Sequence, residues 1–369
     1  MLIADFVADN FIKNSIKEIF LFPGGTIAPL INACLKAGIK VECFKSEQGA
    51  GYAALPSARI TGRPQVVMVT SGPGVTNVLS CLADAYYDST PLVLITGQIG
   101  SGGLKVRKAV RQRGVQETPT VEITKPICQR STCMMSMDAV FREIPLAFRE
   151  VLTPRKGPVV IDFPMDIQNL EIGDHQLPAV AFEGSVSSET NNFTSASQNI
   201  IDVSNVASQS KRPVILLGHG ALDAAAFKQY IDIADQLDAL VVTTFLGIGS
   251  YDTMDSRYIG YIGHTGHLAA NKAVFECDFL LVLGSRLDVR QTGTLVDQFV
   301  PNGKVAWVDL DDTELTNPRV NIDWMFQLDV KEFCGYFLAN IDEINRNIDQ
   351  RWQLKILDSV KESLEDIPN

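Results

Sequence analysis

The sequence predicts an α/β protein with two doubly wound parallel-sheet domains, and three observations support this prediction. At 369 residues the chain is long enough for two domains of roughly 100–200 residues each. Short runs rich in Val, Ile and Leu alternate with helical patterns, which is typical of parallel strands covered by helices on both faces. A polar stretch without periodicity, residues 173–198, divides this alternation into two series.

Each series contains four predicted strands. The strands of the first series are Ile19–Phe22, Val66–Thr70, Leu92–Thr96 and Val159–Phe163. The strands of the second are Val214–Leu217, Leu240–Thr244, Phe279–Leu283 and Val305–Leu310, with a helical segment at Ala221–Leu237. We therefore expect a first domain at 1–172, a linker at 173–198 and a second domain at 199–340. Apolar residues recur near helical spacing from Ile341 to Leu364, so residues 341–369 are predicted to form a linker helix leading towards a further domain.

Composition and charge exclude several classes of protein. A net charge of −11 argues against a nucleic-acid partner, which requires a basic face. No apolar run approaches the roughly 20 residues of a membrane span, and the N-terminus lacks a signal peptide's basic start, so we expect a cytoplasmic protein. The seven Cys form no CxxC pair and are expected to be reduced structural thiols. The basic run Lys105–Arg113 fits a solvated face better than an anion site.

Two local motifs carry candidate chemistry, and each alone is ambiguous. Ser46 suits a helix N-cap and Glu47 suits the first turn that follows, so this segment alone indicates only a helix start. The turn from Thr70 to Asn77 is rich in Gly and opens an apolar helix, which brings backbone close to a ligand. A nicotinamide dinucleotide fingerprint is disfavoured, because Asn77 stands where its third Gly belongs.

Taken together and in this order, the motifs resemble the pyrimidine-binding domain of the acetolactate synthase family of thiamine diphosphate enzymes. The matching segments are Pro23-Gly24-Gly25, Glu47-Gln48-Gly49-Ala50, Thr70–Asn77, Asp88–Pro91, Thr96–Gln98 and Gln116-Glu117. The resemblance implies that Glu47 is the catalytic residue: it binds N1′ of the aminopyrimidine, so that the ring's own nitrogen removes the C2 proton of the cofactor. It further implies that the cofactor is bound by Pro23, Gly24, Gly25, Thr70, Gly72, Pro73, Asn77 and Gln116.

The resemblance continues through the second domain, a central Rossmann-like domain. His264–Ala273 and Gly284–Gly293 are similar to two segments of the family's central domain. In synthase members this domain binds FAD. Other relatives keep the fold without a flavin, so the resemblance implies FAD only as one of two alternatives. The positions that match the FAD contacts are Arg155, Gly220, His264, Arg286, Asp309 and Asp311. No metal site is expected from this sequence, since His264 and His267 alone do not make one.

Some features of the family pattern are missing or changed. The family holds the diphosphate through Mg²⁺ in a third domain marked by a GDG motif, which this sequence does not contain. We therefore expect either a truncated chain or a separate diphosphate-binding subunit, and no turnover by this chain alone. Val115 replaces the usual Phe before Gln116, and Gln129 stands where a Lys is common. The 2-oxo acid and the product are therefore left open.

The leading hypothesis is a thiamine diphosphate-dependent transferase or lyase, a carboligase acting on 2-oxo acids, that forms a homodimer or homotetramer. One alternative is a non-catalytic or regulatory paralogue, which the intact Glu47 disfavours. A nicotinamide-dependent oxidoreductase is the other.

Overall fold

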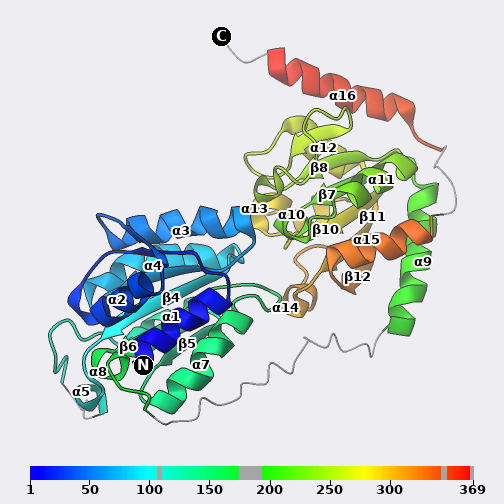
Figure 1. The fold of residues 1–369 in the computed structure, drawn as a ribbon. Helices are drawn as coiled ribbons and strands as arrows, with labels where there is room; N and C mark the ends of the chain where they lie inside the picture. The colour runs from blue at the N-terminus through cyan, green and yellow to red at the C-terminus, as the bar shows by residue number, and fades with distance from the viewer. Residues whose placement is uncertain (106–109, 174–192, 342–346, 366–369) are drawn as a thin grey trace. The chain divides into compact units, whose positions relative to one another are not determined.

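The computed structural model describes residues 1–105, 110–173, 193–341 and 347–365 (Figure 1). The chain divides into two compact units, Met1–Val186 and Ser187–Asn369, and each contains one six-stranded sheet. Every named strand pair is parallel, which confirms the predicted fold class. Most of the predicted linker lies outside the described residues, and helix α9 (Phe193–Gln209) begins within its last part.

The first sheet has the strand order β2-β1-β3-β4-β6-β5. Its strands are β1 (Glu18–Leu21), β2 (Lys40–Cys43), β3 (Gln65–Val69), β4 (Leu92–Gln98), β5 (Arg130–Cys133) and β6 (Val159–Pro164). The chain moves outward from β1 to β2 and then returns to the other side of β1 to form β3. The carboxyl ends of β1 and β3 therefore flank a topological switch point, where doubly wound folds bind their ligands.

Helices cover both faces of this sheet, because alternate strand residues point to opposite sides. Val66 and Met68 belong to one apolar cluster with α1 (Ile3–Lys13), α2 (Ala28–Lys36) and α7 (Met137–Glu150). Val67 and Val69 belong to the other, with α3 (Glu47–Thr61) and α4 (Pro73–Tyr87). In Figure 1, α3 and α4 lie together on one face of the sheet. The short helices of this unit are α5 (Ser101–Lys105), α6 (Thr120–Thr124) and α8 (Met165–Gln168).

The second sheet has the order β12-β11-β10-β7-β8-β9, with its switch point between β7 and β10. Its strands are β7 (Pro213–Leu217), β8 (Leu240–Thr243), β9 (Tyr258–Tyr261), β10 (Phe279–Leu283), β11 (Lys304–Asp309) and β12 (Trp324–Gln327). The core on one face includes residues of α9, α11 (Phe227–Leu237) and α15 (Val330–Ala339). The core on the other face includes residues of α12 (Leu268–Glu276) and α16 (Gln350–Glu365).

Two predicted helices differ from the structure. The single helix expected over 221–237 is wrong, because Ala225 adopts a φ of 51° and separates α10 (His219–Ala224) from α11. The C-terminal helix, α16, begins only at Gln350. Its Trp352 and Ile356 are buried in the core of the second unit, so the first turns of this helix pack on that domain.

The seven thiols are unpaired, and the helices of the described residues lack the combined length and hydropathy of a membrane-spanning helix. All seven cysteines are free, and burial raises the pKa of Cys34 and Cys81 to about 12. Within the part of the chain that the structure describes, no helix is both long enough and apolar enough to cross a membrane.

The close contact between α3 and α4 leads to a first prediction. A Cβ on Gly51 would lie 2.6 Å from Cys81 Sγ and 2.9 Å from its Cβ, so Gly51→Ala is expected to destabilise the protein by about 1–3 kcal/mol. Gly335→Ala on α15 is the control, because a Cβ there meets no atom within 4 Å. That change should stabilise by roughly 0.5–1 kcal/mol, the usual gain of Ala over Gly in a helix. Scanning calorimetry measures both changes, and equal effects would contradict close helix packing at Gly51.

Candidate cofactor site

The loops that follow β1 and β3 touch each other at the switch point of the first sheet. The loop after β1 contains Pro23, Gly24 and Gly25, and the loop after β3 begins at Thr70. A Cβ on Gly24 would lie 2.1 Å from Thr70 Cγ2, so any larger residue there would force the Thr70 side chain to move. The first two predicted binding segments are thus direct neighbours.

The turn after Thr70 also brings Gln116 to this edge of the sheet. Gly72 has a φ of 68°, in the left-handed region that favours glycine. A Cβ at this position would lie 2.7 Å from Gln116 Cβ, so the backbone of Gly72 lies directly against that residue. Pro73 then begins α4, where its missing N–H costs nothing.

Glu47 lies at the first position of α3, beside the first turns of α4. The hydroxyl of Ser46 accepts the Gly49 N–H at 3.0 Å and caps the helix, as the sequence predicted. The side chain of Asn77 donates a hydrogen bond from Nδ2 to Glu47 Oε2 at 3.0 Å. Glu47 is only 7% exposed, and Asn77 is its one hydrogen-bonding side chain among the described residues. The hydrogen-bonding capacity of a carboxylate buried to this extent is satisfied only in part by the protein's own groups.

Two hydroxyl groups that the sequence analysis missed flank the same switch point. Thr26 directly follows Gly25, and Ser71 lies between Thr70 and Gly72. Their Oγ atoms are buried and have no hydrogen-bond partner among the described residues. Buried hydroxyls are nearly always paired, so these two groups suit the polar atoms of a ligand. Their positions inside matched motifs were visible in the sequence, but their lack of a partner was not.

The Asp88–Pro91 motif has a structural role at the other end of α3 and α4. Asp88 forms an ion pair with Arg59 at 2.8 Å, and Arg59 Nε donates to Thr90 Oγ1 at 3.1 Å. These contacts tie the end of α4 to the end of α3. They therefore help to hold the two helices that carry Glu47 and Asn77.

A buried carboxyl group links β4, β6 and the segment that carries Gln116. Asp162 accepts hydrogen bonds from Thr96 Oγ1 at 2.7 Å and from Gln98 Nε2 at 3.0 Å. The same Gln98 amide donates to the Thr118 carbonyl at 2.8 Å, two residues after Gln116. Burial raises the pKa of Asp162 to about 6, and the hydrogen bonds from Gln98 and Thr96 offset only part of this effect. The sequence analysis did not single out Asp162.

The second unit places four of its predicted FAD residues near the carboxyl edge of its sheet. Gly220 follows β7, His264 follows β9, Arg286 follows β10 and Asp309 ends β11. A Cβ on Gly220 would lie 2.9 Å from Gly284 Cα, so the loops after β7 and β10 meet at the switch point. The guanidinium Nη2 of Arg286 lies 3.6 Å from Asp288 Oδ2. The backbone N–H of Asp311 donates a hydrogen bond to Asp309 Oδ1 at 3.0 Å.

Arg155, another predicted FAD residue, belongs to the first unit, and Asp311 directly precedes α14 (Asp312–Leu315) in the second. Arg155 Nε donates to the Ser89 hydroxyl at 2.7 Å, and the Arg155 carbonyl accepts from the Gln129 side-chain amide. These contacts give Gln129, one of the departures from the family pattern, a structural partner. Val115, the other departure, is 86% exposed next to Gln116.

The histidines of the second unit have backbone partners. His264 donates its N–H to the Arg290 carbonyl at 2.7 Å, and His267 Nδ1 accepts the Tyr261 N–H at 3.2 Å. Among the described residues, no group of three or more His, Cys, Asp or Glu side chains is arranged to hold a metal ion. In the basic run, Arg107 and Lys108 lie outside the described residues, while Arg111 and Arg113 are exposed.

The fold and the switch-point site define a cofactor-binding α/β enzyme, and two family profiles identify its class. Residues 1–122 match the family described as "Thiamine pyrophosphate enzyme, N-terminal TPP binding domain". Residues 202–336 match "Thiamine pyrophosphate enzyme, central domain". The chain therefore belongs to the thiamine pyrophosphate enzymes, as the motifs predicted, and these matches favour that class over a nicotinamide-dependent oxidoreductase.

Within this class the chain is similar to acetolactate synthases. It is 30% identical to the acetolactate synthase large subunit of Cyanidium caldarium over 368 residues, which cover 98% of this chain and 62% of the relative. It is 33% identical to the acetolactate synthase large subunit of Corynebacterium glutamicum over 80% of this chain and 46% of that protein. Acetolactate synthase 1, chloroplastic, of Zea mays is 31% identical over 86% of this chain and 49% of its own length. The chain thus spans about half to three-fifths of the length of these relatives.

The buried carboxyl of Asp162 leads to a prediction about pH. Its pKa is 3.8 when unperturbed and about 6 in the fold, so the unfolded chain releases this proton first as the pH rises. The stabilisation is fully present below about pH 4 and is lost as the pH approaches 6, a loss of about 3 kcal/mol in the free energy of unfolding. Asp162→Asn should remove that pH dependence, measured by chemical unfolding from pH 4 to 7.

Asp166 is the matched control for this measurement. Burial alone would raise its pKa, but hydrogen bonds from the N–H and hydroxyl of Ser101 outweigh burial and lower the pKa. The contribution of Asp166 to the free energy of unfolding is therefore lost as the pH falls. Asp166→Asn should change the pH dependence of stability in the direction opposite to that of Asp162→Asn. A stability difference between Asp162→Asn and the wild type that does not change with pH would contradict the role given to Asp162.

Proposed function

We propose that this chain supplies the pyrimidine-binding half of a thiamine diphosphate-dependent carboligase that acts on 2-oxo acids. The observation that carries this proposal is the Glu47 carboxylate, which is nearly buried at the start of α3 and has a single side-chain partner within the described part of the chain. It lies in the unit that matches the cofactor-binding family, close to the loops after β1 and β3. A carboxylate in this setting gains from a ligand that brings a second hydrogen-bonding atom.

The residues present fit the aminopyrimidine end of the cofactor. Thiamine diphosphate supplies the carbon nucleophile and the electron sink that 2-oxo acid chemistry needs. Glu47 would hold a proton between its carboxylate oxygen and N1′ of the aminopyrimidine. Asn77 fixes the orientation of that carboxylate through the bond to Oε2, and the hydroxyls of Thr26 and Ser71 offer further polar contacts. A Gln at position 47 could hold the ring but could not exchange the proton.

We further propose that Mg²⁺ and the diphosphate are held by a third domain or a separate subunit, as the family resemblance implies. In this arrangement two subunits face each other, so the protein would form a homodimer or homotetramer. Support comes from the exposed aromatic side chains of Tyr52 on α3 and of Tyr86 and Tyr87 on α4, which suit a protein interface. A strict monomer in sedimentation at micromolar concentration would contradict this proposal.

The location of the protein is also proposed on the basis of the sequence. We propose the cytoplasm, because the sequence contains no apolar run long enough to span a membrane. Some relatives, such as the Zea mays protein, are named as chloroplastic. Cell fractionation with an antibody against this chain tests the location, and recovery in an organelle would contradict it.

A second cofactor, FAD, is proposed for the second unit. Support comes from the switch point between β7 and β10, where the loops that carry Gly220 and Arg286 meet. Asp309, at the carboxyl end of β11, offers a carboxylate that suits a ribose hydroxyl. In this proposal Gly220 gives the flavin nucleotide close access to the backbone, while His264 and Arg286 contact its polar groups.

The central test of the proposed function is the Glu47→Gln variant. In enzyme completed by its diphosphate-binding domain or subunit and loaded with thiamine diphosphate and Mg²⁺, we expect the exchange of the cofactor's C2 proton to slow by roughly 10²-fold or more, because the amide cannot relay a proton. Cofactor affinity should fall only modestly, since the shape and the hydrogen bond to the ring are kept. NMR of the bound cofactor measures the exchange rate.

Glu332→Gln is the matched control, because Glu332 is also an acidic residue in the first turn of a helix, α15. This change should cost at most about 0.3–1 kcal/mol of stability and leave proton exchange unchanged. If Glu47→Gln also kept the wild-type exchange rate, Glu47 would be only a helix-start carboxylate and the proposed function would fail.

The FAD proposal is tested by titrating the protein with FAD and following quenching of flavin fluorescence. Asp309→Ala should weaken binding by roughly tenfold or more, the usual effect of losing a hydrogen bond to a charged group. Asp232→Ala on α11, which removes a carboxylate away from the carboxyl edge of the sheet, should leave the affinity unchanged. A wild-type protein that shows no saturable FAD binding would refute this second proposal.

A further inference from the structure

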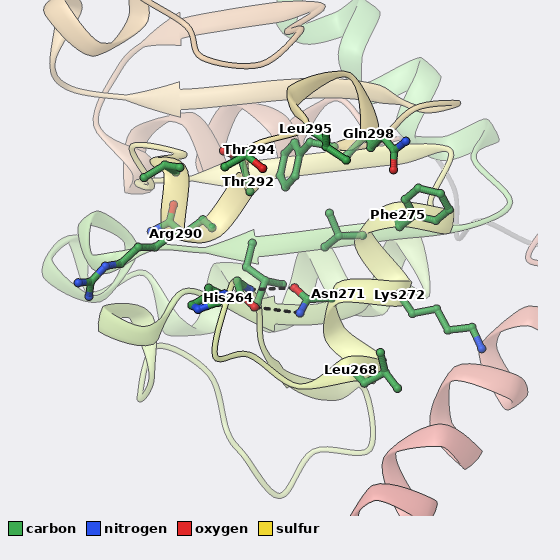
Figure 2. A pocket seen from close by; sticks show the side chains of 18 residues that line it. His264, Leu268, Asn271, Lys272, Phe275, Arg290, Thr292, Thr294, Leu295 and Gln298 are labelled. Atoms are coloured by element: carbon green, nitrogen blue, oxygen red, sulfur yellow. Dashed lines mark hydrogen bonds between the residues drawn. The ribbon is translucent and has the colours of Figure 1, made fainter.

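A cavity of about 920 Å³ lies in the second unit between α12 and the connection from β10 to β11 (Figure 2). In a doubly wound domain such a connection normally carries a helix that covers the sheet. Here it contains only α13 (Val289–Thr292) and the 3₁₀ turn η4 (Val296–Gln298). The short elements leave a hollow beside α12, with a volume in the usual range of small-molecule sites.

The lining of this cavity is mainly apolar. Val274 and Val300 are buried side chains of the core behind it. Leu268, Phe275 and Leu295 line it as well and are 76%, 48% and 67% exposed. Apolar side chains that line one hollow and remain open to solvent are a feature of ligand-binding surfaces.

The charged side chains of the lining are all basic. The chain has 43 acidic and 32 basic residues, yet the cavity is lined by Lys272 and Arg290 and by no Asp or Glu. Neither cation forms an ion pair with a carboxylate among the described residues. Figure 2 shows Arg290 at one end of the cavity and Lys272 at the other. The electrostatic character of this hollow is therefore opposite to that of the whole chain.

The walls of the cavity are held in place by hydrogen bonds that need no ligand. Asn271 on α12 exchanges two bonds with the backbone of Gly263, at 2.8 and 3.0 Å (dashed in Figure 2). On the other wall, Arg319 donates to Thr292 Oγ1 at 3.2 Å and to the Gly293 carbonyl at 3.0 Å. A site preformed in this way loses little conformational entropy on binding.

The cavity shares only His264 with the residues proposed above to bind a cofactor. Glu47 and the thiamine diphosphate loops belong to the first unit. Of the predicted FAD residues in the second unit, His264 lines the cavity, whereas Gly220, Arg286 and Asp309 do not. Neither proposed cofactor therefore accounts for the apolar lining around Phe275.

We propose that this cavity binds a small elongated anion with an apolar body, such as a medium-chain carboxylate. Leu268, Lys272 and Phe275 recur at helical spacing and share one face of α12. The apolar body would lie along Leu268 and Phe275, and the acidic group would pair with Lys272. Arg290 adds a second positive charge at the far end, and the absence of carboxylates from the lining removes repulsion.

The probe for this site is decanoate, titrated into the 369-residue chain while tryptophan fluorescence is recorded. Trp307 and Trp352 belong to the same apolar cluster as Val274 and Val300, so they report on the cavity. We expect saturable binding of one decanoate per chain. Decylamine, which has the same chain length and the opposite charge, should bind roughly tenfold more weakly or worse.

Two pairs of variants locate the binding. Phe275→Asp places a carboxylate beside the ligand and should weaken decanoate binding by about tenfold or more. Phe227→Asp is its control, on α11 and with a similar exposure of 42%. Lys272→Glu should weaken binding by roughly three- to tenfold, whereas Lys228→Glu, with the same change in net charge, should not.

Several results would overturn the proposal. Equal affinities for decanoate and decylamine would show that the cavity does not select anions, and no saturable binding at millimolar decanoate would show that it is not a site. Equal effects of Lys272→Glu and Lys228→Glu would place the ligand elsewhere, and this comparison decides the matter even if Phe275→Asp fails to fold. Displacement of decanoate by FAD would assign the cavity to the dinucleotide instead.

Discussion

The close packing of α3 against α4 is the constraint on which the candidate site depends. Gly51 leaves no room for a side chain beside Cys81, and this contact brings the first turns of the two helices together. Glu47 then lies within hydrogen-bonding distance of Asn77, although the two residues are 30 positions apart in the chain. At the other end, the pair of Arg59 and Asp88 fixes the same two helices. The site's geometry is thus set by helix packing more than by the loops around it.

The two sheets have different strand orders, and they use their switch points differently. In the second sheet the glycines of the two central loops meet backbone atoms, and Gly220 and Gly284 let these loops pack closely against each other. In the first sheet the corresponding loops leave the hydroxyls of Thr26 and Ser71 buried without a partner. Such groups are costly unless a ligand satisfies them. At the first switch point two buried hydroxyl groups therefore lack hydrogen-bond partners among the described residues. The glycine contacts at the second switch point do not leave such groups unpaired.

Much of the fold could be predicted from the sequence, and the parts that were missed share a physical cause. All eight predicted strands exist, and they are the four central strands of each sheet, whose two buried faces require continuous apolar runs. The missed strands β2, β5, β9 and β12 are the sheet edges, where solvent permits polar residues. Glu47 and Asn77 could be found because they lie in motifs. Asp162 could not, because its partners Thr96 and Gln98 are distant in the sequence and adjacent only in the sheet.

The polarity of these edge strands has a consequence for solubility. An open edge exposes backbone groups to which a strand of another molecule can add, and charged side chains oppose this. Strand β2 carries the ion pair of Lys40 and Glu42, and β5 carries Arg130, which pairs with Glu143. The charged side chains on both edges of the first sheet therefore oppose the addition of a strand from another molecule and the aggregation that would follow. Continuous intermolecular sheets between copies of this unit are therefore disfavoured.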